Sequence, residues 1–161
     1  MRPMRRKDRE ITDPEKIHQI ISDCHCCRLG FCDQGKAYIV PLNFGCALEN
    51  GKYVFYFHGA KEGRKIDLIR ETGWAGFEMD TGYRLHTTNV HEACDYTAAF
   101  QSIIGGGSVS FVEDPEEKRN ALSCIMAHNT GRSEWEFPDA MLNVTCIYKL
   151  EVEELSCKEH E

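Results

Sequence analysis

The residue types best suited to chemistry gather in residues 56–67, YFHGAKEGRKID, where an apolar strand leads into an expected helix near Arg64. A helix N-terminus presents unpaired N–H groups and a partial positive charge, which suit a phosphate. Gly63 allows close approach of the backbone, and Lys61, Arg64 and Lys65 add positive charge. Arg64 can also bind two oxygens at once. The stretch fits a phosphate cradle, and it equally fits a solvated helix start with ordinary surface charges.

A second candidate is residues 38–44, YIVPLNF, an apolar strand interrupted by Pro41. Proline lacks an N–H, so it is confined to edge strands and bulges. The free backbone groups of such a strand could hydrogen-bond the rim of a flat heterocycle, and Asn43 offers both a donor and an acceptor. The alternative is an edge strand whose proline protects it from aggregation.

The cysteines and histidines give weaker signals. Residues 24–27, CHCC, contain a CxxC spacing, but zinc normally requires a second pair and a thioredoxin-like motif would open a helix. Buried thiols are the alternative, and we predict no metal site. Among the seven histidines, His58 closes the apolar strand beside the candidate cradle. It is the candidate ligand contact or proton donor, and a structural hydrogen-bonded role is its alternative.

Mostly short strands must position these residues. Strands are expected over residues 27–32, 36–44, 52–58, 74–80, 95–112 (as one strand or two) and 144–152. The turn sequences DQG (33–35) and ENG (49–51) separate the first three. The triple glycine at 105–107 predicts a bend or bulge in a long strand.

Three helices complete the pattern. They are expected over residues 12–24, with a Thr12–Glu15 capping box, over 64–71, and from Asp114 to a stop near Gly131. Strands do not alternate regularly with helices, so a doubly wound parallel sheet is disfavoured. The sequence predicts a mainly β (α+β) fold, a small antiparallel barrel with peripheral helices.

Composition bounds the class of protein. The 161 residues suggest one domain, 1–161, with a basic, solvated arm at 1–11 and a loose tail at 156–161. A net charge of −7 disfavours nucleic-acid binding. No apolar run is long enough for a membrane span, and no secretory signal is recognised. Nine cysteines without such a signal indicate a reducing compartment, so we predict a cytoplasmic protein.

In this order, the pieces resemble the flavin-binding split-barrel superfamily of pyridoxamine 5′-phosphate oxidase, and within it the 5-nitroimidazole resistance (Nim-type) branch. The stretches that carry the resemblance are MRRKDREI (4–11), CRLGF (27–31), YIVPLNFG (38–45), YFHGAKEGRKIDLI (56–69), YTAAFQSIIGGGSV (96–109) and EKRNALSCIMAHNTGR (117–132). The pairing of VPLNF with YFHxAxxGRK is more specific than either piece alone.

The resemblance implies a homodimer of six-stranded antiparallel split β-barrels, with two FMN molecules at the subunit interface. By position it implies cofactor contacts from Val40, Pro41, Leu42, Asn43, Tyr56, Phe57, His58, Arg64, Lys65, Gln101, Ser102 and His128. Arg64 and Lys65 match the phosphate-binding basic pair of the motif, and His128 and its neighbours are placed near the partner's site.

The resemblance also implies an activity, an FMN-dependent oxidoreductase. NAD(P)H or another donor would supply electrons that pass through FMN to a small flat acceptor such as a 5-nitroimidazole. Oxidation of pyridoxamine phosphate is an alternative, although Asn43 replaces a basic residue of the oxidases and their C-terminal Trp and Arg have no clear match. Two further hypotheses stay open, a flavin- or haem-binding module without turnover and a cysteine-based metal or redox protein.

Overall fold

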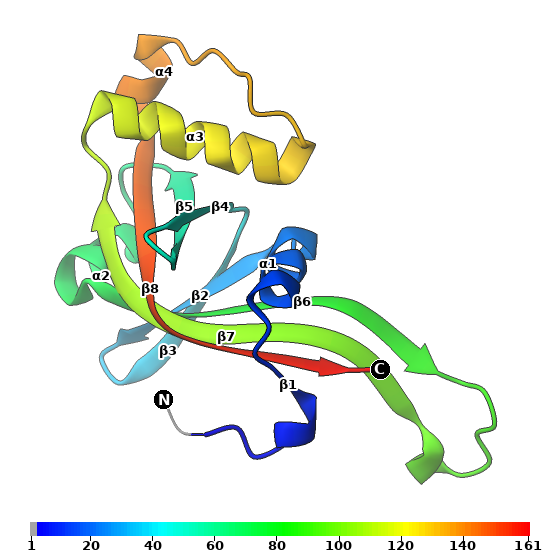
Figure 1. Ribbon diagram of the computed structural model, residues 1–161. Helices are drawn as coiled ribbons and strands as arrows, with labels where there is room; N and C mark the ends of the chain where they lie inside the picture. The colour runs from blue at the N-terminus through cyan, green and yellow to red at the C-terminus, as the bar shows by residue number, and fades with distance from the viewer. Residues whose placement is uncertain (1–2) are drawn as a thin grey trace.

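One curved antiparallel sheet dominates the computed structural model, which describes residues 3–161 (Figure 1). Its strands are β1 (Glu10–Ile11), β2 (Cys27–Asp33), β3 (Lys36–Leu42), β4 (Gly45–Glu49), β5 (Lys52–Gly59), β6 (Trp74–His86), β7 (Thr97–Phe111) and β8 (Cys146–His160). They follow the order β3-β2-β6-β7-β8-β5-β4, and β1 pairs with β8. Since β3 and β4 stand at opposite ends of this order, the barrel is open between them.

A shared core explains the curvature of the sheet. Leu29 of β2 and Phe55 of β5 come from opposite halves of the strand order, yet both are fully buried in one cluster with Phe77, Ile103 and Leu150. Alternation along each strand sends every second side chain to this core. The predicted class, an antiparallel split barrel with peripheral helices, is confirmed, with eight strands in place of the expected six.

The helices pack against the barrel in two places, the main core and the outside of β5 and β8. These are α1 (Pro14–Asp23), α2 (Arg64–Thr72), α3 (Pro115–Thr130) and the short α4 (Asp139–Val144), with 3₁₀ turns at Lys7–Arg9 and Ala93–Asp95. Apolar residues of α1 and α2 enter the main core, whereas α3 packs on the outside of β5 and β8 in a second cluster.

Local signals set most helix ends. Asp114 caps α3 by accepting a hydrogen bond from the Glu117 N–H at 2.9 Å, and Gly131 ends it in the left-handed conformation. The cap of α1 differs from the prediction. Asp13, not Thr12, accepts the 3.1 Å hydrogen bond from the Glu15 N–H. A carboxylate next to Pro14 supplies the same acceptor one residue later than expected.

Three strand boundaries differ from the predictions. The expected strand 36–44 ends at Leu42, and the unpredicted β4 begins at Gly45. β6 continues six residues beyond the expected end at Asp80, to His86. The single strand β7 spans the triple glycine, and its register against β8 shifts between Gly106 and Gly107, so the predicted bulge is confirmed.

Both chain ends are held in the sheet, although the sequence predicted a solvated arm and a loose tail. Val144 still belongs to α4, and β8 runs from Cys146 to His160, so the expectation of a loose tail at 156–161 is wrong. The physical reason is that β7 and β1 supply backbone partners on both edges, with Lys158 facing Ser102 and Glu10. At the other end, Glu10–Ile11 of the basic arm is held in the sheet by the same pairing.

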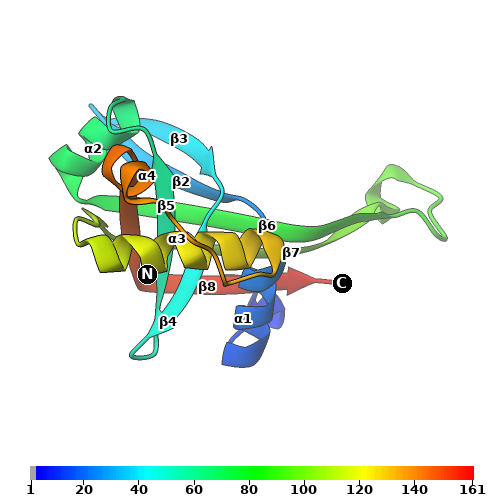
Figure 2. The same cartoon turned by 90° about the horizontal axis from the view of Figure 1, so that it is seen from above.

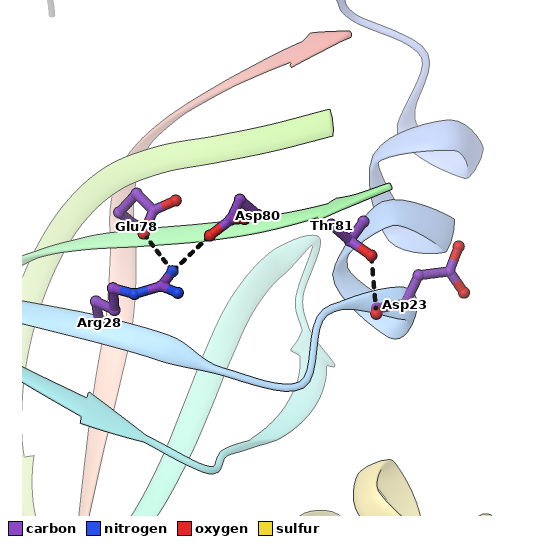
Figure 3. Close-up of polar contacts among 5 residues, drawn as sticks. All are labelled: Asp23, Arg28, Glu78, Asp80 and Thr81. Carbon is purple, nitrogen blue, oxygen red and sulfur yellow. Dashed lines mark hydrogen bonds and ion pairs between the residues drawn. The ribbon is translucent and has the colours of Figure 1, made fainter. Parts of the chain in front are cut away.

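The far parts of β6 and β7 form an arm that projects from the barrel, as Figures 1 and 2 show from two directions. The register of the two strands shifts between Thr81 and Arg84, where the arm begins. The Thr81 hydroxyl donates a 3.3 Å hydrogen bond to the Asp23 carbonyl at the end of α1 (Figure 3). This contact joins the base of the arm to the body of the protein.

Candidate functional site

The corner between β5 and α2 has an open, uncapped helix start. Gly63 is the N-cap with φ of 128°, and no side chain caps the helix. Its carbonyl accepts from the N–H groups of Ile66 and Asp67 at 2.9 and 3.1 Å. Within residues 3–161, the N–H groups of Arg64 and Lys65 have no acceptor. A Cβ added at Gly63 would meet nothing within 4 Å, so the space beside the N-cap residue is open.

Arg64 links this corner to β3. Its Nε and Nη2 donate to the Asp33 carboxylate at 2.7 and 2.5 Å, and its guanidinium lies 4.3 Å from the centre of the Tyr38 ring. The side chain remains 56% exposed. Asp33 therefore orients the guanidinium and engages two of its N–H groups, which leaves the other donors for an anion.

Lys65 is the available cation of the pair. No hydrogen bond or ion pair joins its ammonium to another residue in 3–161. Its Nζ lies against Gly59, where an added Cβ would approach it to 3.2 Å. An unpaired ammonium, an oriented guanidinium and two free N–H groups form a donor set that fits a phosphate monoester.

The three consecutive β5 residues have different environments. Phe57 is fully buried and stacks on Tyr148, with ring centres 5.5 Å apart. Tyr56 is buried under α3, and its hydroxyl donates to Glu49 at 3.0 Å. Burial and this contact raise the pKa of Tyr56. Only the His58 side chain is exposed at the end of the strand, next to the α2 corner.

β3 borders the opening of the barrel. It pairs with β2 alone, so its second edge has no strand partner within the described residues. The prediction that Pro41 marks an edge strand is therefore confirmed. Val40 and Leu42 pack partly against the main core, whereas the Pro41 side chain is exposed. The free edge offers backbone donors and acceptors to a flat ring, apart from the N–H that Pro41 lacks.

Asn43 and His128 make contacts within the protein. The Asn43 amide donates to Asn129 Oδ1 at 3.2 Å and to the His25 carbonyl at 3.4 Å. His128 Nε2 donates to the Cys24 carbonyl at 2.7 Å, and its ring lies 4.2 Å from that of Phe44. Both side chains join the end of α3 to the segments that precede β2 and follow β3.

Asn129, two residues before Gly131, completes this junction, and the sequence did not predict its contacts. Its amide donates to the carbonyls of Phe44 and Ile125 at 3.0 and 2.7 Å. It holds the turn between β3 and β4 against α3. Only its place near a helix end signalled it, since its partner Phe44 is 85 positions away.

Gln101 and Ser102 do not join the cradle within one chain. Gln101 donates to the Glu159 carboxylate across β7 and β8. Ser102 borders a different cavity of about 580 Å³, together with Ile104 and Lys158. The structure therefore brings together β3, His58, Arg64 and Lys65, and it leaves these two residues elsewhere.

An ion-pair fork on the outer face of the sheet also escaped the sequence analysis. Arg28, the cross-strand neighbour of Pro41, donates to Glu78 at 2.8 Å and to Asp80 at 2.5 Å (Figure 3). The two carboxylates raise the pKa of Arg28. All three side chains are partly exposed, so the fork contributes about 1 kcal/mol or less to stability.

The CHCC segment has the environment of buried thiols. Cys24 and Cys27 are fully buried in the main core. Burial and nearby carboxylates raise the pKa of the Cys24 thiol to about 12, and burial raises that of Cys27 further. Across residues 3–161, no group of three or more His, Cys, Asp or Glu residues is arranged to hold a metal. In the same range, no helix combines the length and apolar character of a membrane span.

These features define an open antiparallel barrel with an uncapped, cation-bearing helix start beside a proline-containing edge strand. The family model described as pyridoxamine 5′-phosphate oxidase matches residues 13–159. The chain belongs to this family, as the resemblance predicted. No curated protein matches it.

Comparison with solved structures supports the same fold. The chain is 32% identical to a proposed 5-nitroimidazole antibiotic resistance protein from Bacteroides thetaiotaomicron, with a TM-score of 0.78 over 93% of this chain and 86% of the other. The flavocytochrome Anf3 from Azotobacter vinelandii is 18% identical, with a TM-score of 0.78 over 99% and 72%. An FAD- and haem-binding protein from Mycobacterium smegmatis is 15% identical, with a TM-score of 0.79 over 95% and 74%.

Proposed function

We propose that the chain binds FMN and transfers electrons through it to a small flat acceptor. One observation carries the proposal: the uncapped N-terminus of α2, with unpaired Lys65 and oriented Arg64, opens beside the free edge of β3. A phosphate at one end and a flat ring at the other would match these two features.

Different residues contact different parts of FMN in this proposal. Lys65 and the first N–H groups of α2 hold the phosphate, and Arg64, positioned by Asp33, adds a second cation. The free edge of β3 meets the polar rim of the ring. When bound, FMN supplies the two-electron chemistry. His58 is an exposed titratable side chain at this corner and can donate a proton to the acceptor.

The similarity to the Bacteroides protein supports a 5-nitroimidazole as a candidate acceptor. NAD(P)H is the candidate donor that the resemblance implied. The flavocytochrome and the FAD- and haem-binding protein favour a second candidate, a flavin- or haem-binding module without turnover. The absorption spectrum of the purified protein and the identity of its released cofactor separate flavin from haem. Oxidation of NAD(P)H with a nitroimidazole present separates turnover from binding alone.

The proposal includes a cytoplasmic homodimer. Ile39 and Ile104 are 62% and 51% exposed on the outer face of the sheet, beside the row of paired glycines Gly30, Gly76 and Gly106. These exposed apolar side chains beside glycines leave room for a second sheet, with the Arg28–Glu78–Asp80 ion pairs as polar neighbours on the same face. Ser102 lies on the same face of β7 as Ile104, so in such a dimer it would lie near the second copy.

The test is the affinity for FMN of Arg64→Ala/Lys65→Ala, measured by flavin fluorescence. Loss of two phosphate-facing cations should weaken binding by about 2–3 kcal/mol or more, which is roughly 30- to 150-fold. Lys52→Ala/Arg119→Ala removes the same charge from distant elements and should leave affinity nearly unchanged. Equal FMN affinity in the wild type and the cradle variant would refute the proposed site.

A further inference from the structure

A positively charged cavity lies beyond the cradle. Its volume is about 230 Å³, and it forms where α2, the end of β7 and the starts of α3 and β8 meet. Lys61, Arg70, Phe111, Glu113, Lys118 and Cys146 are among its lining residues. This volume is below the range of about 300–1,000 Å³ usual for whole small-molecule ligands. The cavity therefore suits one charged group of a ligand.

Contacts with neighbouring elements hold the three cations in place. The ammonium of Lys61 donates to the Asn143 carbonyl, and that of Lys118 reaches the Leu142 carbonyl at 3.5 Å. These carbonyls belong to the last turn of α4, where cations are favoured. Each ammonium has three N–H donors, so each keeps at least two for another acceptor.

Arg70 is held more loosely. Its guanidinium lies 5.6 Å from the centre of the Phe111 ring, and its ion pair with Asp67 is long, at 3.5 Å. It is 58% exposed, so this pair contributes little and most of its N–H donors remain available.

The charges around the cavity do not balance. Among the lining residues, Glu113 is the one carboxylate against three cations, in a chain whose net charge is −7. All four charged groups affect the pKa of the Cys146 thiol. Burial and then Glu113 raise its pKa, and Arg70, Lys118 and Lys61 oppose that rise. Convergent cations from three elements create a positive potential that concentrates small anions.

We propose that this cavity is a second oxyanion site, which takes a phosphoryl or carboxylate group. Lys61 precedes Arg64 by three residues, so their Cα atoms lie at most about 11 Å apart. The site is thus a neighbour of the FMN cradle. Two sources present the same chemistry, a free small oxyanion or the second phosphate of a flavin dinucleotide. The dinucleotide source rests on the proposed function, whereas oxyanion binding itself does not.

The first experiment titrates inorganic phosphate into the full chain carrying Arg64→Ala/Lys65→Ala, so that the cradle is disabled, and follows backbone amide shifts by NMR. Saturable shifts around Arg70 and Lys118 are expected. On this background, Arg70→Gln or Lys118→Met should weaken binding roughly three- to tenfold, as loss of one charge-assisted contact at a partly exposed site would. Glu113→Gln should tighten it by a similar factor.

Lys118 also touches α4, so Lys118→Met could perturb folding, whereas Arg70→Gln tests the site without that contact. Phosphate binding that is absent, or unchanged in both Arg70→Gln and Glu113→Gln, would overturn the proposal.

The second experiment compares FMN and FAD affinities of the otherwise wild-type chain with and without Arg70→Gln. Weaker FAD binding with unchanged FMN binding would support the site and assign it to the dinucleotide. Unchanged affinity for both flavins, with weakened phosphate binding in the first experiment, would support the site and assign it to a free oxyanion. Failure of the chain to bind either flavin would count against the proposed function, while the phosphate titration still decides the site.

Discussion

The adjacent side chains of Arg64 and Lys65, in the first turn of α2, differ in whether other residues hold them in place. Arg64 is fixed by Asp33 and Tyr38, whereas Lys65 has no charged partner in residues 3–161. An oriented guanidinium requires little reorganisation when a phosphate arrives, and an unpaired ammonium supplies net charge. Arg64 therefore supplies selectivity for the geometry of a phosphate, and Lys65 supplies electrostatic attraction.

The sequence predicted the position of this basic pair but not its partners. A strand followed by glycine and a helix start is a local pattern, and it placed Arg64 and Lys65 correctly at the beginning of α2. Asp33 lies 31 positions from Arg64, so no local signal could show that the ion pair forms. The same limit applies to the contact of the Asn43 amide with Asn129, which is 86 positions away.

A pH prediction belongs to Cys24. Burial raises its pKa to about 12, whereas an unfolded thiol titrates near 8.5. Between these values the folded chain keeps a proton that the unfolded chain loses. The free energy of unfolding should therefore fall as pH rises from about 9 towards 12, with Cys24 contributing up to about 1.4 kcal/mol per pH unit.

Denaturant unfolding at several pH values checks this. Cys24→Ala should make the decline shallower, whereas Cys32→Ala, at an exposed thiol, should not change it. A decline equally steep in the wild type and in Cys24→Ala would show that the thiol is not protected.

At the scale of elements, the close approach of β4 to α3 fixes the second wall of the open barrel. A Cβ at Gly45 would collide with the backbone of Ile125 and lie 2.6 Å from the carbonyl carbon of Cys124. The backbone of α3 cannot yield as a flexible side chain would, so such a Cβ has no room. Glycine is required here by packing, because no positive φ is involved.

Gly45→Ala should therefore destabilise the fold by about 2 kcal/mol or more, as overpacking does. Chemical denaturation gives this difference in the free energy of unfolding. Gly59→Ala is the matched control, since its methyl group would meet only the flexible end of Lys65. Equal stability of Gly45→Ala and the control would contradict the described packing of α3.

An element could be predicted where the signal for it lies within its own residues rather than in its contacts with other elements. The apolar residues of α2 and α3, and the short runs rich in aromatic or β-branched residues in β2 and β5, are local signals, and these elements lie where expected. β4 and the end of β8 depend on neighbours. β4 is separated from β3 by the turn that Asn129 holds, and residues 156–160 extend between β7 and β1 despite their charged composition.

At the scale of the whole molecule, the outer face of the sheet and the arm carry apolar residues that one chain leaves uncovered. Ile39, Ile104 and Leu85 are at least 45% exposed, and Tyr83 on the projecting arm is 72% exposed. Isolated two-stranded ribbons have little stability in water, so a second copy packed here would stabilise the arm as well as bury the face.

Sedimentation velocity tests this association. The wild type should sediment as a particle of twice 18.4 kDa, and Ile104→Glu should shift it towards the single chain. Val144→Glu places the same charge at a 70% exposed position on α4 and should leave the dimer intact. A monomeric wild type, or an Ile104→Glu variant that remains fully dimeric, would contradict the proposed interface.

The phosphate cradle at the start of α2 is the central claim, and the most direct measurement is the ratio of affinities for FMN and riboflavin, which differ only by the phosphate. We predict that the wild type binds FMN at least about 100-fold more tightly, as expected for two charge-assisted contacts. The ratio should fall towards one in Arg64→Ala/Lys65→Ala. Equal affinity of the wild type for both flavins would contradict the account.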